Sequence, residues 1–182
     1  DMKLASDVMT PEVLWSFGRI GSVSVSPDQK TLVYDVTYFN KEEDRSYSDI
    51  YVMNLADGKS KQLTDTDYKE FGETWTSDGK IAFMSSKSGS VQLWEMNADG
   101  SGLTQLTNIE GGIGGFIFSP DKSKLLFLKD VKLEQDVHDL HPDLPKANAR
   151  LIDGQVYRHW NDWVEAYTHP FVADYIPGQM VT

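Results

Sequence analysis

Apolar positions along this chain gather in short runs, and the spacing of these runs repeats. The segment 51–64, "YVMNLADGKSKQLT", contains an apolar run, a turn with Asn, Asp and Gly, and a second run that ends in Gln-Leu-Thr. The segment 94–107, "WEMNADGSGLTQLT", carries the same features at nearly the same intervals. Short apolar runs bounded by turn residues are typical of strands. The pattern therefore predicts a β protein built from an internal repeat.

The repeat also includes a turn centred on an aspartate. Its three copies are "SVSVSPDQKTLVYDV" from Ser22, "GETWTSDGKIAFMSS" from Gly72 and "GGFIFSPDKSKLLFL" from Gly114. The turn aspartates lie 50 and 43 residues apart, which indicates a unit of about 43 residues with a few extra residues in the first copy. Units of about 40 to 45 residues with four strands each are typical of propeller blades.

Strand composition supports the same fold. The second strands, 31–36 "TLVYDV" and 124–128 "KLLFL", are nearly continuous in apolar character, as expected for sheets covered on both faces. Pro27 and Pro120 favour the second position of a turn, and Asp78-Gly79 favours a tight turn with positive φ. The Gly-His and Trp-Asp signature of WD repeats is absent from the sequence, which disfavours that group of propellers.

We therefore predict an all-β fold, a β-propeller fragment of about three four-stranded blades with a short N-terminal helix. Thr10 as N-cap, Pro11 at the first helical position and Glu12 in the first turn mark that helix. The expected divisions are an N-terminal segment 1–21 and a partial propeller 22–182, with blades at about 22–67, 72–109 and 114–182. In the middle blade, Gly72 to Thr107, we expect Trp75, Phe83 and Trp94 to pack between blades.

Two segments interrupt the period. Residues 37–49, "TYFNKEEDRSYSD", are charged and flanked by aromatic residues, and we interpret them as a solvated loop in preference to a recognition element. A larger insertion spans about 131–166 in the third blade. After it, 169–182, "HPFVADYIPGQMVT", is expected to supply that blade's last two strands.

Three blades cannot close a ring, and an open arc leaves an apolar face at each end. We therefore expect the chain to be part of a longer protein, with association through the open blade edges as another possibility. The opening "DMKLASDVMT" lacks the basic and apolar regions of a signal peptide, and Asp1 precedes Met2, which indicates a processed or engineered start.

Charge and composition exclude several functions. The 182 residues include 17 basic and 28 acidic side chains, so the net charge is −11 and binding to nucleic acid or to an anionic membrane is disfavoured. The sequence has no cysteine, which excludes disulfides, thiolate metal sites and a cysteine nucleophile. No apolar run reaches the length of a membrane-spanning helix.

The sequence offers no catalytic constellation. A serine hydrolase of the α/β class needs a Gly-x-Ser-x-Gly elbow, which is absent, so we assign no catalytic residue to this chain. His138 and His141 lie among Asp136, Asp139 and Asp143 and would permit a metal. Their proline-bounded segment reads as a loop without a Glu-x-x-His helix, so we predict no metal site and no cofactor.

The segment 157–165, "YRHWNDWVE", is unusually dense in aromatic and basic residues. Such density suits a strand or helix packed on the rim of the propeller, or a contact surface for a peptide or another domain. We expect 150–165 to be ordered, with Trp160 or Trp163 largely buried. The candidates for contact with a substrate or another domain are Arg158, His159, Trp160 and Trp163.

Several stretches resemble a known family. They are "MTPEVLWSFGRIGSVSVSPDQKTLVY", "DIYVMN", "SKQLT" and "DLPKANARLIDGQVYRHWNDWVE". They resemble the N-terminal propeller of prolyl-oligopeptidase-family serine peptidases, in the bacterial dipeptidyl-peptidase V and acylaminoacyl-peptidase-like branch, and the resemblance covers essentially the whole chain. The Ser-Pro-Asp and Gln-Leu-Thr elements are shared with TolB-like propellers and are less specific.

The resemblance implies a propeller of seven or eight blades that caps a C-terminal α/β-hydrolase domain and limits access to short peptides. It also implies a periplasmic or secreted bacterial protein. The family's catalytic Ser, Asp and His have no counterpart here, so any enzymatic activity belongs to the longer protein. Two alternatives stay open: a TolB-like binding propeller without enzymatic activity, and a three-blade unit that closes a ring by dimerising.

Overall fold

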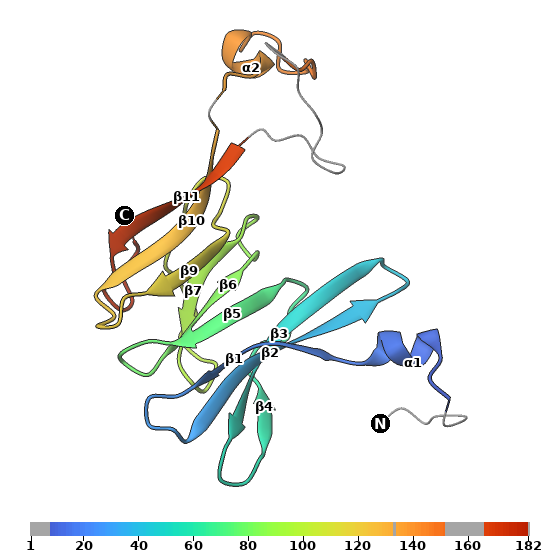
Figure 1. Cartoon of the computed structure of the whole chain (residues 1–182), viewed down its shortest axis with the longest axis vertical. Coiled ribbons are helices and arrows are strands. Elements are labelled where there is room, and N and C mark those ends of the chain that lie inside the picture. The colour runs from blue at the N-terminus through green and yellow to red at the C-terminus, as the bar shows by residue number, and fades with distance from the viewer. Residues whose placement is uncertain (1–7, 133, 152–165, 182) are drawn as a thin grey trace.

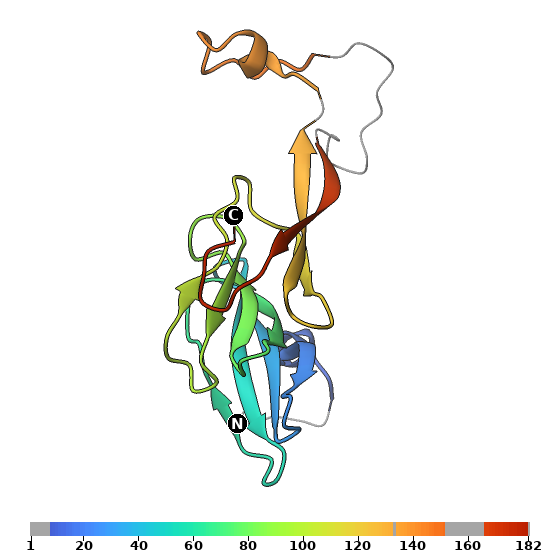
Figure 2. The same cartoon turned by 90° about the vertical axis from the view of Figure 1, so that its left-hand side faces the viewer.

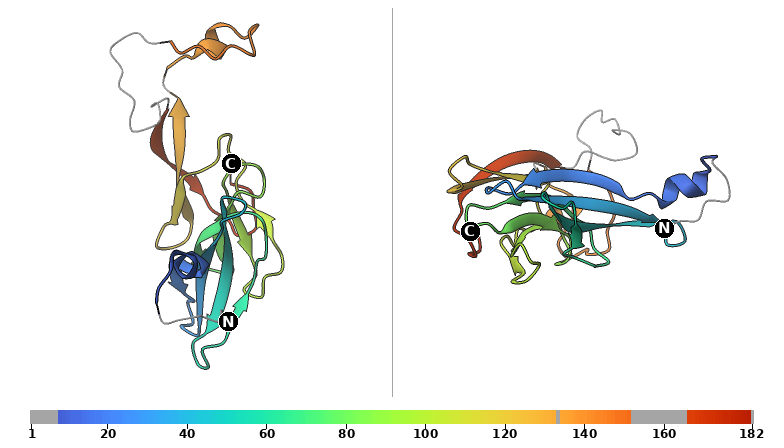
Figure 3. Two further views of the ribbon diagram at one scale, coloured as in Figure 1. Left: turned by 90° about the vertical axis from the view of Figure 1, so that its right-hand side faces the viewer. Right: turned by 90° about the horizontal axis from the view of Figure 1, so that it is seen from below.

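The computed structural model describes residues 8–132, 134–151 and 166–181. These residues form three antiparallel sheets that follow one another in chain order, with the second sheet between the other two (Figure 1). The view from below shows the sheets as successive layers (Figure 3). No helix among the described residues is long and apolar enough to cross a membrane.

The first sheet follows a short helix. Helix α1 (Pro11–Ser16) begins as its sequence predicts, because Thr10 Oγ1 accepts a hydrogen bond from Val13 N at 3.4 Å. The strands of the sheet, in spatial order, are β1 (Arg19–Val25), β2 (Thr31–Asn40), β3 (Arg45–Asn54) and β4 (Ser60–Gln62).

The second sheet is the complete four-stranded blade that the repeat predicts. Its strands, in spatial order, are β5 (Glu70–Trp75), β6 (Ile81–Ser85), β7 (Gln92–Met96) and β8 (Thr104–Gln105). All three pairings are antiparallel.

The third sheet contains β9 (Gly115–Phe118), β10 (Lys124–Lys132) and β11 (Ala166–Asp174), in the order β11-β10-β9. Helix α2 (Val137–Leu140) lies in the insertion between β10 and β11. Figure 2 shows β10 and β11 reaching past the other two sheets toward α2.

The prediction that 169–182 supplies two strands was wrong for the described part of the chain. Residues 166–174 form one strand, paired with β10 along its whole length. The chain then turns back on the second sheet, where Val181 N donates to Leu106 O at 2.7 Å. The Tyr175 ring, 4.6 Å from the Phe118 ring, packs in the core between the sheets, and this burial favours the turn over a fourth strand.

The three aspartate turns share one hydrogen-bond pattern. The hydroxyl of the first turn residue donates to the aspartate two positions later. The pairs are Ser26 with Asp28, Thr76 with Asp78 and Ser119 with Asp121, at 2.6, 2.6 and 2.5 Å. The next residue has a left-handed backbone in each copy, with φ of 60° at Gln29, 78° at Gly79 and 58° at Lys122. The repeated sequence therefore encodes a repeated turn.

The Gln-Leu-Thr motif also has a structural role. Thr64 Oγ1 accepts a hydrogen bond from Ile50 N at 2.9 Å, and Thr107 Oγ1 accepts one from Leu93 N at 2.8 Å. In both copies the leucine N–H donates to the carbonyl of the same third-strand residue. The threonine thus continues the pairing between the third strand and the end of the fourth.

Two apolar cores join the sheets, and β6 contributes to both. Ile81 and Phe83 face the first sheet, in a cluster with Val33 and Ile50, while Ala82 and Met84 face the third sheet. This two-sided burial explains why second strands are continuously apolar. The inter-blade positions predicted for Trp75 and Phe83 are confirmed, and Trp94 packs against the same cluster while partly exposed.

The interpretation of 37–49 as a solvated loop was wrong. These residues extend β2 and β3 into one long hairpin, with pairing that continues from Thr37 opposite Ser48 to Asn40 opposite Arg45. The turn spans 41–44, and Asn40 Oδ1 accepts hydrogen bonds from the backbone of Glu42 and Glu43. Cross-strand pairing satisfies the backbone groups that a loop would leave to water.

Candidate functional site

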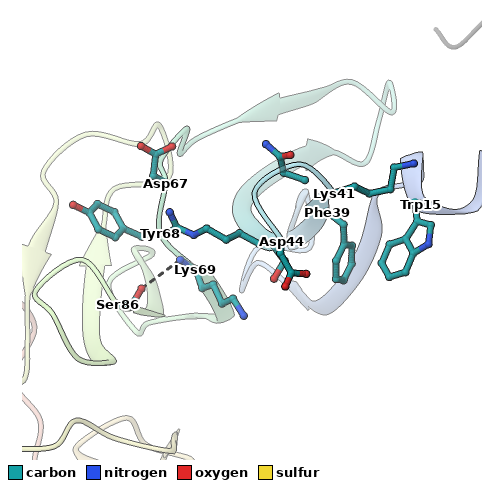
Figure 4. Close-up of a pocket in the computed structure, with 11 residues that line it drawn as sticks. Trp15, Phe39, Lys41, Asp44, Asp67, Tyr68, Lys69 and Ser86 are labelled. Atoms are coloured by element: carbon teal, nitrogen blue, oxygen red, sulfur yellow. Dashed lines mark hydrogen bonds between the residues drawn. The ribbon is translucent and has the colours of Figure 1, made fainter. Parts of the chain in front are cut away.

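A hollow of the described surface lies where α1, the β2–β3 hairpin and the segment before β5 meet (Figure 4). Its volume is about 740 Å³, within the usual range for sites that bind small ligands. Its lining residues are Trp15, Phe39, Asn40, Lys41, Asp44, Arg45, Ser46, Asp67, Tyr68, Lys69 and Ser86.

One side of the hollow is aromatic. The rings of Trp15 and Phe39 meet edge to face, with centroids 5.2 Å apart. The Arg19 guanidinium lies 4.2 Å from the Phe39 ring centroid and 5.2 Å from that of Trp15, so cation–π attraction holds both rings in place. Trp15 remains 41% exposed, which leaves its surface available within the hollow.

The other side of the hollow is charged. Lys41, Arg45 and Lys69 line it together with Asp44 and Asp67, so the local balance is one positive charge in a chain whose net charge is −11. The Arg45 guanidinium lies 5.5 Å from the ring centroid of Tyr47. The hollow is therefore favourable to an anion where most of the surface is not.

Backbone contacts fix the wall that carries Tyr68 and Lys69. Lys69 N donates to Ser86 Oγ at 3.4 Å (dashed in Figure 4), and Lys69 O accepts from Ser86 N at 3.4 Å. Lys69 also forms an isolated parallel bridge with Ser48 of β3. These contacts join the first and second sheets at the hollow, so its two walls keep a fixed relative position.

The hollow lies at the edge of the sheets where second strands connect to third strands. In the first sheet this connection is the turn 41–44, in the second it is 86–91, and in the third it leaves β10 toward α2. Because the sheets repeat one antiparallel order, these connections share an edge. The long insertion of the third sheet therefore begins on the same edge as the hollow (Figure 1).

Buried acids line the seam between the first two sheets, below the hollow. Glu73 is 3% exposed, and Ser22 Oγ lies 3.0 Å from its Oε1 and 2.9 Å from Asp35 Oδ1. Burial, with the nearby Asp35 charge, raises the pKa of Glu73 to about 8. Gly21 is required beside this group, because a Cβ there would lie 2.2 Å from Asp35 Oδ2.

A second acidic group occupies the same seam. Glu70 is 1% exposed, and its burial raises the pKa of its carboxyl group. Asp49 accepts hydrogen bonds from Thr64 Oγ1 at 3.1 Å and Thr66 N at 3.2 Å, and burial raises its pKa as well. Asp49 is held by hydrogen bonds from the protein, whereas Glu70 Oε2 and Glu73 Oε2 are buried without a hydrogen-bond partner. All three acids lie inside the seam, and we assign them to the contact between the sheets.

The site residues expected from the sequence have different outcomes. Arg158, His159, Trp160 and Trp163 lie outside the described residues. Two of the possible metal ligands near α2, Asp136 and Asp139, make other contacts. Asp139 pairs with Lys132, whose Nζ also lies 2.8 Å from Asp136 Oδ2, and Asp136 caps the helix. Within the described residues, no group of three or more His, Cys, Asp or Glu side chains could hold a metal ion.

Sequence reasoning missed the hollow. Its residues come from separated segments, and 64–71, "TDTDYKEF", reads as a solvated linker in isolation. The available signal was the aromatic flank of the charged extension 37–49 together with the exposed Trp15 of the first helix. Neither segment indicates by itself that they meet.

Comparisons with known proteins agree with this architecture. The family profile for the TolB beta propeller domain matches residues 8–155. Dipeptidyl-peptidase 5 of Porphyromonas gingivalis is 45% identical over 175 residues, which cover 96% of this chain and 26% of that protein. The chain thus spans about a quarter of the length of this curated relative.

Two solved structures extend the comparison. The acylaminoacyl peptidase of Pyrococcus horikoshii matches with a TM-score of 0.63 and 18% identity, covering 88% of this chain and 24% of that one. At this identity the match shows the fold alone. A structure described as a TolB from Agrobacterium tumefaciens matches with a TM-score of 0.50 and 25% identity, covering 63% of this chain and 42% of that one.

Proposed function

This chain belongs to the TolB beta-propeller domain family, and from that premise we propose that it is the propeller portion of a peptidase, where it admits and positions short peptides for a catalytic domain. The observation that carries the proposal is the match to a dipeptidyl-peptidase 5 over 96% of this chain at 45% identity. Because that relative is about four times longer, the proposed catalytic groups lie in the remainder of the protein.

The hollow supports a role in binding peptides. It combines exposed aromatic surface with charged side chains on an ordered backbone, which suits a ligand with apolar side chains and charged ends. It also lies on the edge of the sheets from which the long insertion of the third sheet leaves. We place peptide contact at this edge of the propeller.

We further propose that the insertion contacts the peptide or the catalytic domain through Arg158, His159, Trp160 and Trp163. Desolvated Trp and Arg side chains often dominate such contacts. In the whole protein, the double substitution Arg158→Ala, Trp160→Ala is expected to alter peptide turnover more than tenfold, or to lower stability by about 1.4 kcal/mol. If turnover and stability of the double variant equal those of the wild type, the insertion is a tolerated loop without a role in these contacts.

The proposed partners are short peptides and a C-terminal α/β-hydrolase domain, in a periplasmic or secreted bacterial protein. The coding sequence downstream of Thr182 tests this directly. A Gly-x-Ser-x-Gly motif followed by Asp and His supports the hydrolase. Their absence would favour a binding propeller, and fractionation of the source cells would test the location.

Activity provides the decisive test. The whole protein and this chain alone are each assayed with chromogenic dipeptide substrates, with and without a serine-directed inhibitor. We expect inhibitor-sensitive turnover by the whole protein and none by the chain alone. Turnover by the chain alone, or no turnover by the whole protein, would overturn the proposal.

A binding propeller without an enzyme is the second candidate. The match at 25% identity to a structure described as a TolB favours it, because that protein is similar over 63% of this chain. A whole protein without the hydrolase motif that still bound peptides would support this candidate.

The third candidate is a three-blade unit that closes a ring with a second copy of itself. Exposed apolar side chains on the two outer sheets favour it, including Ile20 and Val23 on β1 and Ile117 and Val172 on the third sheet. Light scattering on the whole protein tests it, because a monomer excludes closure by a second copy.

A further inference from the structure

We infer that the hollow binds the carboxylate of a peptide, with Arg45 and Lys69 holding the charge and the aromatic side holding the neighbouring side chain. The choice of a peptide as the ligand rests on the function proposed above. The choice of a carboxylate rests on the geometry and charge of the hollow, which are independent of any catalytic role.

The first argument is that the charges of the hollow sum to a positive value. Among the described residues, Lys41, Arg45 and Lys69 form no ion pair. Three cations and two carboxylates around one concavity leave one net positive charge in an acidic protein, which favours an anionic ligand.

The second argument is that the two principal cations are carried on fixed backbone. Arg45 begins β3, directly opposite Asn40 in the hairpin, and its guanidinium lies against the Tyr47 ring. Lys69 is held between the first and second sheets by its bridge to Ser48 and its hydrogen bonds with Ser86. A preordered backbone lowers the entropy lost when a ligand binds.

The third argument is the arrangement of apolar and acidic groups beside these cations. Trp15 and Tyr68 are 41% and 42% exposed within the hollow, so both can gain buried area against a ligand side chain. Asp44 and Asp67 line the same hollow and would repel a second negative charge. The site therefore favours a single carboxylate next to an apolar residue over a polyanion.

Calorimetric binding to the whole protein tests the inference with defined probes. The peptide Ac-Gly-Ala-Phe is titrated with a free carboxylate and as its C-terminal amide, and its acetyl group removes the competing amine. We expect the carboxylate form to bind at least tenfold more tightly than the amide. A third probe, Ac-Gly-Glu-Phe amide, carries its carboxylate only in a side chain and shows whether the site accepts that source too.

Substitutions locate the site. Arg45→Gln and Lys69→Gln are each expected to reduce the preference for the carboxylate at least threefold, and together to abolish it. Lys30→Gln is the matched control, because Lys30 is exposed and lies outside the hollow. Unfolding midpoints equal to wild type show that the variants fold, as expected for exposed side chains.

The outcomes separate this inference from the proposed function. Equal affinity for the carboxylate and amide probes, or a preference that persists in the Arg45 and Lys69 double variant, would overturn the carboxylate site. If the whole protein prefers the carboxylate probe but does not turn over dipeptide substrates, the carboxylate site is supported and the peptidase proposal is refuted.

Discussion

Ser22 Oγ on β1 lies 3.0 Å from Glu73 Oε1 on β5 and joins the first sheet to the second through a partly buried contact. The same hydroxyl lies 2.9 Å from Asp35 Oδ1. A hydroxyl has one proton, so it cannot donate to two carboxylates at once. A protonated Glu73 removes the conflict by donating to Ser22, which then donates to Asp35. Burial and the nearby Asp35 charge raise the pKa of Glu73 to about 8, so Glu73 keeps the proton that this arrangement needs.

We predict that the stability of the protein falls as pH rises from about 4.5 to about 8. The folded state keeps the Glu73 proton through this range while the unfolded state loses it, so rising pH favours unfolding. Glu73→Gln removes the Glu73 contribution to this dependence, while Glu70 and Asp49, whose pKa values are also raised, keep theirs. Relative to the wild type, it is expected to add on the order of 4 kcal/mol more stability at pH 8.5 than at pH 5, since one pKa unit corresponds to about 1.4 kcal/mol.

Urea unfolding at the two pH values measures this effect. Glu42→Gln is the control, because Glu42 is exposed in the hairpin turn. Parallel pH profiles for the wild type and Glu73→Gln would contradict a neutral Glu73 in the folded protein.

The cross-strand pair Phe83 and Trp94 provides a graded test of inter-blade packing. Phe83 is fully buried, so Phe83→Ala is expected to cost roughly 3 to 5 kcal/mol. Trp94 is partly exposed, and Lys87 Nζ lies 5.8 Å from its ring centroid. Trp94→Ala is therefore expected to cost less than Phe83→Ala in the same urea experiment. The exposed Leu55→Ala is the control, with a change of about 0.5 kcal/mol or less.

The threonine of the Gln-Leu-Thr motif is expected to stabilise its blade through its hydroxyl group. Thr107 is fully buried, and its Oγ1 accepts from Leu93 N at 2.8 Å and donates to Gln92 Oε1 at 2.7 Å. Thr107→Val keeps the shape but leaves Leu93 N without this acceptor and removes one of the two hydrogen bonds to Gln92 Oε1, at a cost of about 1 to 3 kcal/mol. Thr107→Ser keeps the hydroxyl and is expected to lose less. Equal losses for Val and Ser would assign the effect to packing alone.

The aspartate turns allow opposite substitutions at equivalent positions. Gly79 has φ of 78° and a Cβ there would meet no atom within 4 Å, so Gly79→Ala tests backbone strain alone, with an expected cost of about 1 to 2 kcal/mol. Gln29 has φ of 60° at the matching position, so Gln29→Gly is expected to be neutral or to stabilise by up to about 1 kcal/mol. Thermal unfolding of both variants checks the pair, and a stabilising Gly79→Ala would refute the strain argument.

The sequence by itself determined the features that depend on local chemistry. The strands of the second blade, the aspartate turns and the helix at Thr10 follow from hydrophobic spacing, turn residues and capping, which act over a few neighbouring positions. The burial of Phe83 followed in the same way, because a continuously apolar strand needs cover on both faces.

Only the tertiary structure decided the features that join distant segments. The extension 37–49 became a hairpin through pairing across its two halves, and the C-terminal segment turned toward Leu106 because Tyr175 packs between sheets. The hollow requires Trp15, Phe39 and Lys69 to meet, and the raised pKa of Glu73 requires burial against another sheet. Contacts between residues far apart in sequence set these properties, and no local pattern specifies which distant segments pair.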